Sequence, residues 1–130
     1  MGFDDKGNGS FEHFNTVLVV GLDENVTIID TDGKEIPILA KVDTGADCSS
    51  IDKSIYDTLH SAIISSKKIR SASGTDRRDV TQLKVRIKEK ELFGNFNIAD
   101  RSMMKFKMLI GKNILKEGFL IDPSKSTVKK

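Results

Sequence analysis

One aspartate, placed in a glycine turn directly after a β-favouring run, constrains this chain more than any other feature. The run of residues 36–42 is mostly apolar and leads into Asp43, which Thr44 and Gly45 follow. Gly45 lacks a Cβ, so backbone amides can approach the Asp43 carboxylate closely, and the Thr44 hydroxyl can tie this loop to a second one. The pattern predicts a carboxylate presented at the end of a strand. An ordinary surface turn would give the same tripeptide, so the interpretation needs a second element.

That second element stands at residues 108–115, where an apolar run is interrupted by Gly111 and resumes with helical spacing after Lys112 and Asn113. Together with Asp43, this order resembles retroviral-type aspartic peptidases, in which an apolar-apolar-Gly-Arg-Asn segment follows Asp-Thr-Gly and packs beneath the active-site loop. In such enzymes two facing carboxylates activate a water, and the pair shares one proton because like charges at such close range cannot both ionise.

The resemblance implies roles for the residues around both elements. Asp43 would be catalytic, with Thr44 and Gly45 positioning it. Four residues would contact substrate: Ala46, Asp47, Ser73 and Gly74. Three residues would support the loop from beneath: Gly111, Lys112 and Asn113. The retroviral partner of Asp47 is the Arg of Gly-Arg-Asn. Here the pattern predicts an ion pair between Asp47 and Lys112, as a point-charge contact without the bidentate guanidinium fork.

Further segments sharpen the resemblance toward one family. Residues 70–80, 97–104, 109–112 and 119–124 resemble the family named ATP-dependent zinc proteases, and the similarity covers residues 17–126. That family is similar in fold to retropepsins. Its members often occur beside glutamate-ligase-type enzymes, which implies a link to protein glutamylation.

Neither zinc nor ATP has visible ligands in the sequence. The chain holds one Cys and two His, no His-Glu-x-x-His motif and no Walker-type glycine loop, so we expect no metal and no cofactor. A zinc peptidase stays open as a third interpretation, with His13, His60 and Cys48 as the ligands to examine. For Cys48 itself we expect a small packing role, since neither His has a positional link to it.

The length of the chain implies that an active enzyme would be a homodimer. At 130 residues it is one domain, too small for a two-lobed arrangement, and it contains one Asp-Thr-Gly. The second carboxylate must then come from another copy across a two-fold axis. The alternative from another class is a dimeric β-barrel that binds an extended peptide by strand addition without cutting it.

The charge balance gives no case for nucleic acid or a membrane as partner. The chain has 21 basic and 19 acidic residues, a net charge of +2, and no apolar stretch of membrane-spanning length. The lone Cys48 cannot form an internal disulfide, so a reducing cytoplasm is the expected location.

The remaining pattern predicts one all-β domain, a retropepsin-like closed β-barrel with a flap hairpin and one or two short helices. Residues 1–16 are predicted as a flexible arm, 17–126 as the domain and 127–130 as a basic tail. Alternating or β-rich runs predict strands at 17–20, 26–29, 36–42, 83–87, 92–98 and 118–123. Asp52 can cap a short helix whose core face is Ile51, Ile55 and Leu59.

Residues 68–80 are predicted to form the flap hairpin that closes over substrate, because turn residues there are flanked by β-compatible segments. Basic side chains cluster around this hairpin: Lys67, Lys68, Arg70, Arg77 and Arg78. Of these, Arg70, Arg77 and Arg78 could select acidic peptides by pairing with carboxylates. The alternative is a solvated hairpin edge whose charges prevent strand pairing between molecules.

Overall fold

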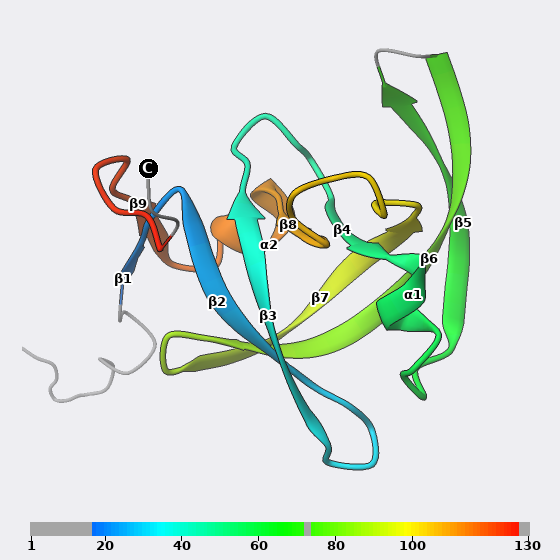
Figure 1. Cartoon of the computed structure of the whole chain (residues 1–130), viewed down its shortest axis with the longest axis horizontal. Coiled ribbons are helices and arrows are strands. Elements are labelled where there is room, and N and C mark those ends of the chain that lie inside the picture. The colour runs from blue at the N-terminus through cyan, green and yellow to red at the C-terminus, as the bar shows by residue number, and fades with distance from the viewer. Residues whose placement is uncertain (1–16, 72–73, 128–130) are drawn as a thin grey trace, which may run out of the picture.

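The computed structural model describes residues 17–71 and 74–127 (Figure 1). The predicted arm of residues 1–16, the predicted substrate-binding residue Ser73 and residues 128–130 of the predicted basic tail lie outside the described residues. No helix in the described part is long and apolar enough to cross a membrane.

Six strands close into a mixed barrel. They are β2 (Asp23–Ile29), β3 (Glu35–Val42), β4 (Ser49–Asp52), β6 (Gly74–Ile87), β7 (Lys90–Ala99) and β8 (Met108–Ile110). Their order is β2-β3-β8-β4-β7-β6, and β6 pairs back onto β2 to complete the closure. The β3–β8 and β4–β7 pairs are parallel and the others antiparallel. The predicted all-β closed barrel is confirmed.

The remaining elements lie outside the barrel. β5 (Ile63–Ser71) pairs with β6 to form the flap hairpin, which is longer than the predicted 68–80 and projects away from the barrel (Figure 1). β1 (Leu18–Val20) and β9 (Phe119–Ile121) form a separate parallel pair. Two short helices, α1 (Lys53–Tyr56) and α2 (Lys112–Leu115), follow β4 and β8.

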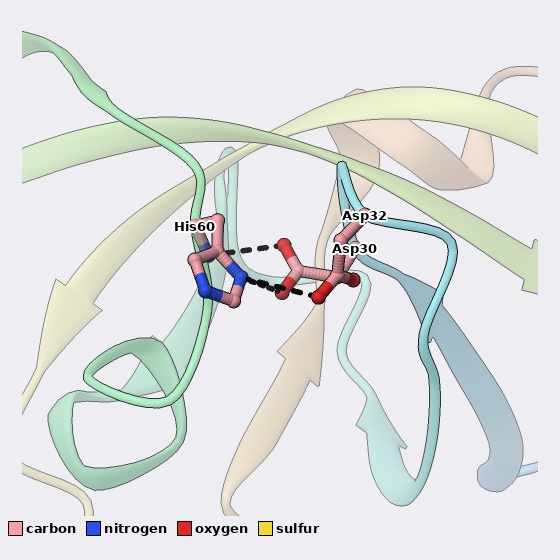
Figure 2. Close-up of side chains that lie close together, drawn as sticks. All are labelled: Asp30, Asp32 and His60. Carbon is pink, nitrogen blue, oxygen red and sulfur yellow. Dashed lines mark hydrogen bonds and ion pairs between the residues drawn. The ribbon is translucent and has the colours of Figure 1, made fainter.

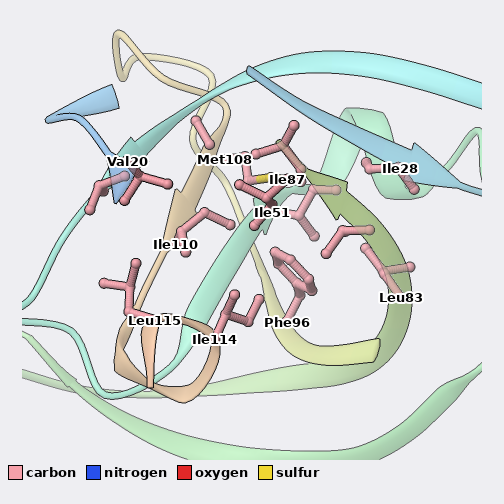
Figure 3. Close-up of a cluster of buried hydrophobic side chains, with 14 of the residues drawn as sticks. Val20, Ile28, Ile51, Leu83, Ile87, Phe96, Met108, Ile110, Ile114 and Leu115 are labelled. Carbon is pink, nitrogen blue, oxygen red and sulfur yellow. The ribbon is translucent and has the colours of Figure 1, made fainter. Parts of the chain in front are cut away.

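Alternating apolar side chains from every barrel strand fill the interior (Figure 3). Leu83, Val85 and Ile87 on β6 are at most 2% exposed, as their spacing predicts, and they meet Phe96 of β7 in the same cluster. Burying each such side chain contributes roughly 1.5–3 kcal/mol. The core therefore fixes the strand register, because a slip by one residue would turn this whole set toward solvent.

Two details differ from the sequence-based expectations. In the alternating run of residues 92–98, Asn97 stands between the apolar Phe96 and Ile98 and so belongs to the polar face, yet it is 3% exposed, and Ser50 Oγ donates to its Oδ1 at 2.9 Å. The face of Ile51, Ile55 and Leu59 does not belong to one helix. Ile51 lies in β4 and the helix spans only one turn, although all three side chains pack on the core and Asp52 caps the helix by accepting from Ser54 N.

The C-terminal segment is exposed but attached to the barrel. Leu22 N donates to Lys125 O at 2.9 Å, and the Asp23 carboxylate accepts from Ser126 Oγ at 2.6 Å and from Thr127 N at 2.6 Å. Residues 125–127 therefore lie against the start of β2. They are exposed to solvent, and the buried carboxylate of Asp23 binds Ser126 and Thr127.

Replacing Asp52 with Asn should lower the free energy of unfolding by about 1–3 kcal/mol at pH 7, since the amide group turns a donor toward groups that already donate. Asp52 accepts from Ser54 N, Ser54 Oγ and Arg101 N. The hydrogen bonds from Ser54 and Arg101 hold its pKa below 3.8 despite the burial that raises it. The wild-type advantage is thus present above about pH 4 and declines as the pH falls through the lowered pKa.

Urea unfolding at pH 7 and at pH 3 measures this difference. The matched control is Asp57→Asn, an exposed carboxylate whose pair with Lys53 contributes little. Equal stability of wild type and Asp52→Asn at pH 7 would contradict the assignment.

Candidate active site

Asp43 lies directly after β3, at the point where the strand leaves the barrel. Its backbone N–H donates to Ile110 O at 2.9 Å, which continues the β3–β8 pairing by one residue. Its carboxylate Oδ1 accepts from Gly45 N at 2.9 Å. The carboxylate is half-buried, and Thr44 is exposed at the tip of the turn. The structure therefore presents this carboxylate as the sequence predicts, with one oxygen held by the glycine amide.

The segment of Gly111, Lys112 and Asn113 lies against the loop that Asp43 begins. Lys112 N donates to Ala46 O at 2.8 Å and Asn113 N to Asp47 O at 3.2 Å. A Cβ added to Gly111 would lie 2.8 Å from Ala46 O and 2.9 Å from the Cys48 carbonyl. Only a glycine allows this close approach of two backbone segments, which explains the break in the apolar run.

A buried polar network holds the far end of the same loop. Asn113 Oδ1 accepts from Ser49 N at 2.9 Å and from Ser49 Oγ at 2.8 Å, and Ser49 Oγ accepts from Gly111 N at 2.9 Å. Asn113 Nδ2 donates to Asn95 O at 2.9 Å. Residues 43–49, which we call the active-site loop, are thus fixed at both ends by side-chain and backbone contacts to one segment.

The expected ion pair between Asp47 and Lys112 is present at 2.9 Å. The hydrogen bond and charge of Lys112 hold the pKa of Asp47 below its usual range. Both side chains are mostly exposed, so solvent and salt screen the pair. The pair therefore contributes little to the stability of the fold.

A pocket of about 460 Å³ lies between the active-site loop and the outer half of the flap hairpin. The loop contributes Gly45, Ala46, Asp47 and Cys48, and β5 contributes Lys67, Lys68, Ile69 and Arg70. Arg78 of β6 also lines it. Of the residues expected to bind substrate, Ala46, Asp47, Arg70 and Arg78 thus come together. Arg77 does not line this pocket, and neither does Gly74, which lies at the far turn of the hairpin with φ of 124°.

Four further residues line the pocket for which the sequence analysis predicts no role: Ser50, Asn97, Arg101 and Leu109. Arg101 is 8% exposed, and its Nε donates to Phe106 O at 3.0 Å. Burial lowers the pKa of its guanidinium and the neighbouring Arg78 lowers it further, whereas Asp52 and Asp43 act in the opposite direction. Arg101 stays a cation, because arginine does not deprotonate in proteins.

Arg78 shares this positive corner of the pocket. Its Nη1 donates to Asn97 Oδ1 at 3.1 Å, while its Nε is buried without a hydrogen bond and lies 3.6 Å from Asp76 Oδ2. The guanidinium groups of Arg78 and Arg101 repel each other, so the binding of an anion between or beside them is favoured. The one sequence signal for Arg101 was its place in the segment of residues 97–104, which gave no hint that the side chain turns inward.

The structure gives the proposed zinc ligands separate partners. Cys48 Sγ lies 3.8 Å from Asn95 O, and His60 Nδ1 lies 2.8 Å from Asp30 Oδ2. His13 lies outside the described residues. Within residues 17–71 and 74–127, the potential metal ligands that lie close together are Asp30, Asp32 and His60, and Cys48 is not among them.

Solved structures share this fold. The Legionella pneumophila protein Lpg0085, of unknown function, aligns with a TM-score of 0.60 at 19% identity over 84% of this chain and 95% of that one. The EIAV protease in complex with the inhibitor HBY-793 aligns with a TM-score of 0.56 at 22% identity, over 73% of this chain and 85% of that one. The protease of simian foamy virus (mac) aligns with a TM-score of 0.53 at 13% identity, over 72% and 91%. At such identities the likeness establishes the retropepsin-like fold.

Sequence comparison gives the family. No curated protein matches the chain significantly. The profile of the RimB-like family, described as retropepsin-like aspartic endopeptidase RimB, matches residues 52–130, which is more than half of the chain and begins after the Asp43 turn. This chain belongs to the RimB-like family of retropepsin-like aspartic endopeptidases.

Proposed function

We propose that this protein is an aspartic endopeptidase that works as a homodimer and hydrolyses peptide bonds with a water held between two Asp43 carboxylates. The observation that carries the proposal is the placement of Asp43. It lies on a turn fixed by the Gly111–Asn113 segment, beside a pocket that opens under a hairpin. The shared fold with retroviral proteases supports the same use of the turn.

One copy supplies one such carboxylate, so the site is complete only when two copies meet. Apolar side chains on and beside the β1–β9 pair support an interface there: Val17, Val19, Leu22 and Leu120 are 54%, 40%, 44% and 61% exposed. Exposed apolar side chains that gather on one surface favour association. In the proposed dimer this contact is isologous, and the two-fold axis must pass beside the active-site loop so that the two Asp43 carboxylates face each other.

The proposed reaction uses one ionised and one protonated carboxyl group. The ionised Asp43 accepts a proton from the water, whose oxygen attacks the peptide carbonyl carbon. Asp43 of the partner subunit gives its proton to the carbonyl oxygen, which yields a neutral tetrahedral diol. Collapse of the diol breaks the C–N bond: the leaving nitrogen takes the proton from Asp43, and one diol hydroxyl gives its proton to the partner's Asp43 as the product carboxyl group forms. The two carboxyl groups end the cycle with the one proton that they held at the start.

A peptide-binding module without catalysis is the second candidate, and the flap hairpin favours it. Among the described residues, β5 pairs only with β6. Its other edge can therefore accept a strand added by a bound peptide. A peptide-library assay separates the two functions. Cleavage by the wild-type protein supports the enzyme, whereas groove binding without any cleavage supports the module.

The charge of the pocket supports acidic substrates. Lys67 lies opposite Arg78 and Lys68 opposite Arg77 in the β5–β6 register. Like charges in directly opposed cross-strand positions destabilise a hairpin. Carboxylates of a bound peptide would remove this repulsion and would also reach Arg101, so binding an acidic peptide and ordering the hairpin would favour each other.

Peptides with several Glu residues should therefore be cleaved with a higher kcat/KM than neutral peptides of the same length at low salt. The Arg78→Gln variant should lose most of this preference, because it removes a charge from the pocket lining. Its matched control is Arg86→Gln, on the same strand but paired with Glu35 and Glu91 outside the pocket. Raising the salt concentration should reduce the preference as well, since charges are screened over about 10 Å at 0.1 M. Equal kcat/KM on acidic and neutral peptides at low salt would leave the basic residues as a solvated hairpin edge.

A further inference from the structure

Three potential metal ligands converge on one point at a distance from the active-site loop (Figure 2). Asp30 follows β2, Asp32 lies in the turn before β3, and His60 lies between α1 and β5. His60 Nδ1 is 2.8 Å from Asp30 Oδ2 and 3.6 Å from Asp32 Oδ2. The side chain of Asp30 is fully buried, while those of His60 and Asp32 are 63% and 50% exposed. One face of the cluster is thus open to water.

The backbone fixes these ligands independently of the contact between the side chains. Asp30 Oδ1 accepts from Thr31 N at 2.9 Å and from His60 N at 3.0 Å, which leaves Oδ2 for the imidazole. Asp32 Oδ1 accepts from Lys34 N at 3.0 Å, which likewise leaves Oδ2 directed at the ring. Each carboxylate therefore has one oxygen held by backbone amides and one oxygen facing His60 Nδ1.

We propose that His60 Nδ1, Asp30 Oδ2 and Asp32 Oδ2 bind one divalent cation of the zinc class. The three ligand atoms lie within 4.8 Å of one another. Two ligands about 2.0–2.2 Å from a tetrahedral zinc ion are separated from each other by roughly 3.3–3.6 Å. The distance from Asp32 Oδ2 to His60 Nδ1, 3.6 Å, lies at the upper end of that range, and the distance from Asp30 Oδ2 to His60 Nδ1, 2.8 Å, must widen by roughly half an ångström to admit an ion.

The donor set selects the kind of ion. An imidazole nitrogen with two carboxylates suits zinc and similar borderline ions, whereas calcium and magnesium prefer oxygen ligands throughout. The ion would displace the Nδ1 proton that His60 shares with Asp30, and this proton passes to the solvent. Next to the cluster is a pocket of about 420 Å³, lined in part by Asp30, Thr31, Gly33 and Ser61, with room for the waters that complete the coordination.

The ion would have a structural effect. His60 belongs to the segment that leads into β5, and both aspartates belong to the connection between two barrel strands. A metal would therefore tie the root of the flap hairpin to the barrel. None of the three ligands lines the pocket beside the active-site loop. Binding should raise the thermal stability of the protein without being required for peptide hydrolysis.

Titration of the full chain with zinc chloride, followed by calorimetry and by thermal unfolding, tests the proposal. We expect one equivalent to bind and to raise the Tm of the wild type, because a ligand that binds only the folded state stabilises it. Asp32→Asn and His60→Gln should each lose that equivalent, and circular dichroism should show both to be folded. The matched control Asp57→Asn, an exposed carboxylate paired with Lys53, should bind as the wild type does.

Absence of binding by the wild type, or an equivalent that survives in both Asp32→Asn and His60→Gln, would overturn the site and leave His60 and Asp30 as an ion pair only. Peptide hydrolysis in strong chelator separates this inference from the proposed function, because it should continue whether or not the metal binds. Activity lost on zinc removal and regained on its return would contradict the structural role.

Discussion

Replacing Asp43 with Asn is expected to abolish peptide hydrolysis, by on the order of 10³-fold or more in kcat/KM, while the fold and the proposed dimer are retained. An amide fills the same space and can still accept the hydrogen bond from Gly45 N, which the Asp43 Oδ1 accepts at 2.9 Å. It cannot take the proton of the attacking water or share a proton with a second carboxyl group. The measurement is steady-state hydrolysis of an acidic peptide by the purified variant, with circular dichroism and size-exclusion chromatography as checks of fold and assembly.

Mixing the variant with wild-type protein extends the test to the dimer. If each site needs an Asp43 from both copies, an excess of the Asp43→Asn chain should draw wild-type subunits into inactive mixed dimers and reduce their activity. Asp57→Asn protein in the same excess should not. Near-wild-type turnover by the variant alone would contradict the aspartic mechanism. Full wild-type activity in the mixture would contradict a site that needs an Asp43 carboxylate from each copy.

The parts of the fold that the sequence predicts are those in which neighbouring residues carry the information. The inward side chains of β6 follow a two-residue period, and the Asp32–Gly33 turn joins β2 to β3 where Gly33 adopts a φ of 89°. The four-residue spacing of Ile51, Ile55 and Leu59 predicts one helical face, and this is wrong because the three side chains pack on the same core without belonging to one element. Spacing by four residues identifies a common environment and does not distinguish a strand end followed by one helical turn from a longer helix.

The candidate site divides in the same way. Asp43, its glycine and the Asp47–Lys112 pair could be predicted because short motifs carry them. The Ser49–Asn113 contacts and the inward turn of Arg101 could not, since each depends on the register between strands far apart in the chain. Asn97 illustrates the reason. It alternates as a surface residue should, but the flap strand places Arg78 against it, and a side chain from β4 donates to it from the other side.

Replacing Gly111 with Ala should reduce kcat by roughly 10²-fold, because a small displacement of catalytic groups has an effect of that size. The backbone of Gly111 has a φ of −101°, which alanine adopts without strain, so the effect is one of contact alone. The new Cβ would meet Ala46 O at 2.8 Å and the Cys48 carbonyl at 2.9 Å. These are backbone atoms of the active-site loop, which cannot rotate away as a side chain can, so the loop that begins at Asp43 must move.

Gly94→Ala is the matched control for this prediction. Its Cβ would approach Ile114 Cδ1 at 2.7 Å, a comparable crowding, but against a side chain that can change its rotamer. Both variants should lose about 1–3 kcal/mol of stability from overpacking, and only Gly111→Ala should lose turnover with a nearly unchanged KM. Steady-state hydrolysis measures kcat and KM of the two variants, and urea unfolding measures their stability. If Gly111→Ala keeps the wild-type kcat while losing stability, the contact between the two segments supports the fold and does not position Asp43.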